Sequence, residues 1–131
     1  MAVTRVNIGK NPQRVAGDAL DIERNVTVPT GVLLTKGWCT IKADPADADV
    51  DAALQKIITT TASTGVGHIV EPGADGVANI RFELTGADTL ALGHGILYHF
   101  DIQVLTDNNK VETVEVGTIG PLIKGITDAS S

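Results

Sequence analysis

Two stretches of the chain alternate strictly between apolar and polar residues, which is typical of half-buried β-strands. The apolar positions of the first stretch are Ala78, Ile80, Phe82 and Leu84. Those of the second are Ile96, Tyr98, Phe100, Ile102 and Val104. Alternation of this kind belongs to antiparallel sheets that have one face on a core. We therefore predict two strands, with Phe82, Tyr98 and Phe100 as core side chains.

A short corner separates these strands, and a turn follows the second. Residues 85–92 are too few for a long helix, so we predict one turn of α- or 3₁₀-helix there, followed by glycines that permit a tight re-entry. Residues 106–110 contain Asp and Asn and predict a turn. Residues 111–118 then return as the second arm of a hairpin. Tyr98 stands just after the corner, where it can act as a tyrosine corner.

The first half of the chain is less regular. Residues 20–28 alternate, but Arg24 falls on the apolar face, which predicts either a bulge or an edge position from which the side chain snorkels to water. Residues 32–43 predict one or two strands, in which Trp38 and Ile41 are both expected to be buried although their phases are opposite. Residues 54–61 and 67–70 complete the set of predicted strands.

Seven or eight short strands separated by turns predict an all-β fold, an immunoglobulin-like antiparallel β-sandwich with a short helical corner. Trp38 on an early central strand fits this layout, and a barrel is the alternative. We divide the chain into residues 1–17, an N-terminal arm or first strand, and residues 18–131, the sandwich domain.

The net charge and the lengths of the apolar runs argue against nucleic acid and membranes as partners. The 131 residues carry a net charge of −6, and Lys and Arg are scattered singly, so nucleic acid is not expected as a partner. No apolar run approaches the length that spans a membrane, and the first ten residues lack the apolar core of a secretory signal. We expect a soluble protein made in the cytosol. The single cysteine, Cys39, is predicted to be a small core residue.

The acidic stretch of residues 44–51 resembles the start of a calcium loop, because Asp44, Asp47, Asp49 and Asp51 carry the carboxylates. Ala52 stands where that pattern needs glycine, and Ile58 where it needs glutamate. We therefore predict a solvated loop whose aspartates cap a short helix over residues 50–54.

No residue pattern predicts a reaction centre. His68, His94 and His99 lack the close spacing of metal ligands, and the Gly-x-Gly pieces precede strands rather than helices. We predict no catalytic residue, no cofactor site and no metal site.

Residues Thr4, Arg5, Val6, Asn7 and Ile8 are strand-like and stand before a Gly-Lys-Asn-Pro linker. Such an arm can add a strand to the open sheet edge of a neighbouring subunit, where main-chain hydrogen bonds provide affinity. The alternative is that it pairs within its own sheet.

Residues 84–119 resemble the small immunoglobulin-like domains of bacteriophage virion proteins, which occur in baseplate upper proteins, tail components, and head fibre or decoration proteins. The resemblance is carried by the corner Thr85–Leu92, the stretch Gly95–Asp101, the hairpin Asp107–Val111 and the strand Gly117–Ile119. His99 stands where this family often has Tyr, and the earlier two-thirds of the chain match more loosely.

The resemblance implies a non-enzymatic virion structural protein, made in the host cytoplasm and assembled into the particle through contacts with other virion proteins and with its own copies. Two further hypotheses belong to other classes. A carbohydrate-binding module is the first, although Trp38 and Tyr98 are both expected to be occupied by the core. A hydrolase on a sandwich scaffold is the second, and it requires a buried carboxylate pair or a metal cluster in a cleft.

Overall fold

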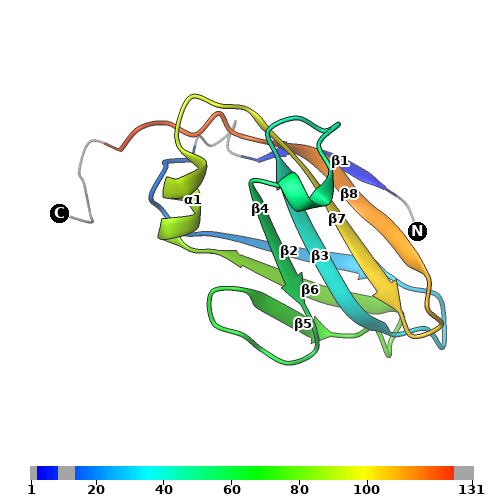
Figure 1. Cartoon of the computed structure of the whole chain (residues 1–131). Coiled ribbons are helices and arrows are strands. Elements are labelled where there is room, and N and C mark those ends of the chain that lie inside the picture. The colour runs from blue at the N-terminus through cyan, green and yellow to red at the C-terminus, as the bar shows by residue number, and fades with distance from the viewer. Residues whose placement is uncertain (1–2, 9–13, 126–131) are drawn as a thin grey trace.

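The chain folds into two β-sheets that face each other across a common interior (Figure 1). The structure is a computed structural model and describes residues 3–8 and 14–125. Within them the strand orders are β1-β8-β7-β3-β4 and β2-β6-β5. This is the strand arrangement of immunoglobulin-like sandwiches, so the predicted fold class is confirmed.

The five-stranded sheet is antiparallel except at one edge. It contains β1 (Thr4–Ile8), β3 (Leu34–Lys42), β4 (Leu54–Ile58), β7 (Tyr98–Thr106) and β8 (Val111–Ile119). β1 runs parallel to β8, and the other neighbours are antiparallel. β7 and β8 form the predicted hairpin, whose turn includes Asn109 with a φ of 66°. The region of residues 32–43 forms one strand with an irregular register between Leu34 and Lys36.

The three-stranded sheet contains β2 (Leu20–Thr27), β5 (Gly67–Glu71) and β6 (Val77–Leu84). β2 pairs with β6 along its full length, from Leu20 opposite Leu84 to Thr27 opposite Val77. β5 pairs with the other side of β6. The alternation along these strands places one set of side chains in the interior and the other set on the outer surface.

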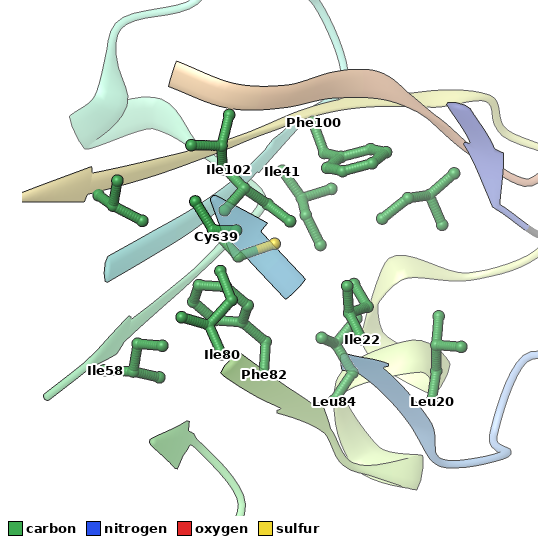
Figure 2. Close-up of a cluster of buried hydrophobic side chains, with 14 of the residues drawn as sticks. Leu20, Ile22, Cys39, Ile41, Ile58, Ile80, Phe82, Leu84, Phe100 and Ile102 are labelled. Carbon is green, nitrogen blue, oxygen red and sulfur yellow. The ribbon is translucent and has the colours of Figure 1, made fainter. Parts of the chain in front are cut away.

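Apolar side chains fill the space between the sheets. Figure 2 labels ten of them: Leu20, Ile22, Cys39, Ile41, Ile58, Ile80, Phe82, Leu84, Phe100 and Ile102. Burial raises the pKa of the Cys39 thiol to about 12, in keeping with a core residue. The predicted inward position of Ile96 is wrong, because Ile96 precedes β7 and is 47% exposed.

The corner between β6 and β7 is longer than a single turn. It forms the α-helix α1 (Gly86–Leu92) at one end of the sandwich (Figure 1). Thr85 and Asp88 make a capping box, in which the Thr85 hydroxyl accepts from the Asp88 amide and the Asp88 carboxylate accepts from the Thr85 amide. These bonds satisfy two amides at the helix start and explain why so short a segment is helical.

Two ion pairs join the five-stranded sheet to β2 and to α1. In the first, Arg24 of β2 lies between the inward-facing Ile22 and Val26 and forms a two-pronged pair with Glu115 of β8, at 2.6 Å and 3.2 Å. The Glu115 side chain is only 3% exposed. Arg24 therefore points into the sandwich. It occupies a position among apolar residues because its ionic partner, Glu115, lies on the opposite sheet.

In the second pair, Lys56 of β4 reaches α1. Its Nζ lies 2.8 Å from the Asp88 carboxylate and donates to the Gly65 carbonyl at 2.8 Å. Burial raises the pKa of Asp88, but the hydrogen bonds from Lys56 and Thr85 outweigh it and hold the pKa below its usual value. The helical corner is thus fastened to the five-stranded sheet.

Candidate functional site

A surface hollow lies on the outer face of the five-stranded sheet. It has a volume of about 380 Å³, and its lining includes Arg5 of β1, Asp101 of β7 and Val116 of β8. Arg5 and Asp101 are both paired with Val116 in the sheet register, so the three form one cross-strand row. Thr40 of β3 extends this row on the far side of Asp101. The hollow therefore spans four adjacent strands.

Asp101 is the half-buried carboxylate of this surface. Its pKa is raised by burial, with a further increase from the charge of Asp49 and a decrease from that of Lys42. No hydrogen bond or ion pair joins its carboxylate to another residue within the described ranges. The site thus contains an acceptor that the fold itself does not use.

A loop from the β3–β4 connection forms one wall of the hollow and contributes Pro45. Lys42 holds this loop, since its Nζ lies 2.8 Å from the Asp49 carboxylate and donates to the Asp47 carbonyl at 2.7 Å. The hydrogen bond to Asp49 raises the pKa of Lys42, so its charge is already paired. Arg5, by contrast, is exposed and has no such pair among the residues described.

The acidic stretch forms this loop, but its aspartate side chains do not cap the short helix in it. Its helical part is the 3₁₀-helix η1 (Asp49–Asp51), which has no side-chain cap, and Leu54 already belongs to β4. The predicted capping by aspartates is therefore wrong. Asp44 instead accepts a hydrogen bond from the Ala46 amide at 2.9 Å, which makes a local turn.

The strand-like arm of residues 4–8 pairs within its own chain, as strand β1 on the edge of β8. Thr4, Arg5 and Asn7 are exposed, whereas Val6 and Ile8 pack against the core. Of the two alternatives for this arm, intramolecular pairing is the one seen in the fold. Its linker, residues 9–12, lies outside the described residues.

Trp38 does not belong to the core, so the expectation for this residue is wrong. It lies on the outer face of β3, because the neighbouring Cys39 takes the inward phase. The Lys36 ammonium lies 5.2 Å from the centre of its ring, and the exposed Ile57 of β4 is its cross-strand partner. The tryptophan thus contributes to a surface and not to the packing between sheets.

The other three aromatic residues singled out in the sequence lie inside. Phe82 and Phe100 occupy opposite sheets of the core, and Tyr98 is buried at the start of β7. The Tyr98 hydroxyl donates to the Leu92 carbonyl at the end of α1, which is the arrangement of a tyrosine corner.

The histidines are dispersed. His68 lies on β5, His94 is exposed in the α1–β7 loop, and His99 lines the hollow beside Asp101. No group of three or more His, Cys, Asp or Glu side chains within the described ranges could hold a metal ion. None of the helices in the described part of the chain is long and apolar enough to cross a membrane.

Sequence reasoning missed two charged residues that matter most in the structure. Glu115 is predicted only as part of a return strand, and the signal for its role is Arg24 on the apolar face of another strand. Asp101 is predicted only as one of the polar positions that alternate with Tyr98, Phe100 and Ile102 along its strand. Its position in the middle of a five-stranded sheet was the available signal, since a central polar position has neighbours on both sides.

Comparison with known proteins gives a fold likeness alone. No protein-family model matches the chain, and no curated protein matches it. Among solved structures, that of the NK cell receptor NKp44, described as a triggering partner in natural cytotoxicity, is similar at 15% identity with a TM-score of 0.43. The alignment covers 92% of this chain and 100% of the receptor chain.

Proposed function

We propose that this protein is a non-enzymatic structural component of a bacteriophage virion, either a capsid decoration or head fibre protein or a tail or baseplate component. The proposal rests first on the resemblance of residues 84–119 to virion domains. The helical corner α1, the β7 strand and the β7–β8 hairpin are the elements that carry that resemblance.

The structural observation that supports the proposal is that β4 is an edge strand with one unpaired side. β4 pairs with β3 on one side, and no described strand pairs with its other side. Ile57 on this edge strand is 44% exposed and stands opposite Trp38. An unpaired strand edge beside an apolar cross-strand pair is a template for contact with another protein chain.

This edge suits a subunit of a symmetric lattice, in which each copy presents the same surface to its neighbours. The partners would be major capsid or tail subunits together with further copies of this chain. A net charge of −6 disfavours direct contact with the packaged nucleic acid.

The test begins with mass spectrometry of purified particles, joined to low-dose imaging that locates the protein on them. The protein is expected in the particles at a stoichiometric copy number. Its absence from them would remove the proposal.

A pair of variants then tests the role of the β4 edge. Ile57→Lys places a charge at the proposed contact and should abolish incorporation into particles. Val70→Lys is the matched control, because Val70 is 51% exposed on β5 in the other sheet. Equal incorporation of both variants would show that the β4 edge is not the contact.

A further inference from the structure

The cross-strand row Arg5–Val116–Asp101 places a cationic, an apolar and an anionic side chain next to one another on the outer face of the sheet. Neighbouring strands lie about 4.8 Å apart, so Arg5 and Asp101 stand about 10 Å from each other across Val116. The row thus offers a donor group, an apolar floor and an acceptor group in sequence. All three residues line the same hollow.

The charges around the hollow cancel. Lys42 is paired with Asp49, which leaves the Arg5 guanidinium and the Asp101 carboxylate as the two groups with no ionic partner in the described structure. A net anion would be repelled by Asp101, and a net cation by Arg5 and Lys42. An uncharged ligand with both donors and acceptors satisfies the two groups at once.

We infer that this hollow binds a neutral saccharide unit. One carbon face of the sugar ring would lie on Val116, with hydroxyl groups donating to Asp101 and accepting from Arg5. Thr40 adds a further hydroxyl next to Asp101, since its oxygen accepts from Gln55 at 2.9 Å and its own proton remains to be donated. A volume of about 380 Å³ falls in the usual range of small-ligand sites, roughly 300–1,000 Å³.

The saccharide hypothesis is preferred over a zwitterionic ligand because of Val116. A small zwitterion such as an amino acid concentrates its two charges close together, whereas Arg5 and Asp101 are separated by an apolar residue. A sugar ring is apolar on its faces and polar around its edge, which matches this order. The inference concerns a different surface from the β4 edge and does not depend on the proposed virion role.

The experiment is an amide-resolved NMR titration of the isotope-labelled protein with the methyl glycosides of glucose, galactose, mannose and N-acetylglucosamine at millimolar concentration. At least one glycoside is expected to shift the amide signals of Asp101, Val116 and Arg5. The signals of the β7–β8 turn at the other end of the strands should not move.

Two variants test the contacts. Asp101→Asn and Arg5→Met should each weaken binding about tenfold or more, because each removes a charge-assisted hydrogen bond. Asp107→Asn in the exposed β7–β8 turn is the matched control and should bind as the parent protein does.

Stability separates a binding effect from misfolding. Burial raises the pKa of Asp101, so its ionised form opposes folding at neutral pH, and Asp101→Asn should be at least as stable as the parent. A stable Asp101→Asn that has lost binding supports the inference.

Three results would each overturn it. In the first, no glycoside moves the amide signals of the hollow. In the second, Asp101→Asn binds with unchanged affinity. In the third, the hollow responds to glycine or to lysine methyl ester but to no glycoside, so that the ligand is charged.

Discussion

The ion pair between Arg24 and Glu115 should be the most sensitive polar contact of the fold. The Glu115 side chain is 3% exposed, whereas that of Arg24 is 33% exposed. Arg24→Leu leaves a carboxylate in the interior without its cation and should cost about 3 kcal/mol. Glu115→Leu leaves a guanidinium that water can still reach and should cost about 1.5 kcal/mol.

The double variant should recover much of this loss, because two leucines extend the apolar interior formed by Ile22 and Val26. We expect it to lie within about 1.5 kcal/mol of the parent protein, which gives a coupling energy of at least about 3 kcal/mol. The free energies of unfolding are measured by urea titration, followed by far-ultraviolet circular dichroism. Glu23→Gln, which weakens an exposed pair with Arg81, is the control and should have a much smaller effect.

The asymmetry between the single variants is the decisive result. If Glu115→Leu costs more than Arg24→Leu, the argument from exposure is wrong. If the coupling energy is below about 0.5 kcal/mol, the two side chains do not act as a pair.

Three other perturbations test separate parts of the fold. Tyr98→Phe removes the donor to the buried Leu92 carbonyl and should cost about 1–2 kcal/mol, measured by urea unfolding. Asp88→Asn should cost about 1 kcal/mol at pH 7. Since the pKa of Asp88 is lowered in the folded state, this cost should begin to shrink as the pH falls below about 4 and disappear once the pH is below the lowered pKa; a cost that persists there would contradict the assignment. Cys39 should resist a thiol reagent at pH 8 in the native protein and react in urea, because burial raises its pKa to about 12; rapid native reaction would contradict that.

The sequence predicted the strands well where burial is periodic. Along β7, the inward positions from Tyr98 to Val104 alternate as expected, since each strand residue changes face. The prediction that Trp38 is buried is wrong because successive side chains of a strand face opposite sides of the sheet. Cys39 and Ile41 point inward, so Trp38 points outward. Hydrophobicity alone gave it the wrong phase.

The candidate site was less accessible to sequence reasoning. Arg5, Asp101 and Val116 are brought together only by the parallel β1–β8 register and the antiparallel β7–β8 register. Neither register has a local signal that links the start of the chain to its end. The predicted corner is too short for a simpler reason, since the prediction rests on the length of the segment and the capping box of Thr85 and Asp88 extends the helix.

The parallel pairing of β1 with β8 has a consequence for synthesis on the ribosome. Asn7 bonds to Thr118, a separation of 111 residues, so the earliest strand has no partner until the last one has emerged. Until then, β1 is an unpaired hydrogen-bonding edge on a nascent chain, and contacts this distant in sequence form slowly. Completion of the five-stranded sheet must therefore follow translation of β8, and the row that joins Arg5 to Asp101 is among the last features of the molecule to form.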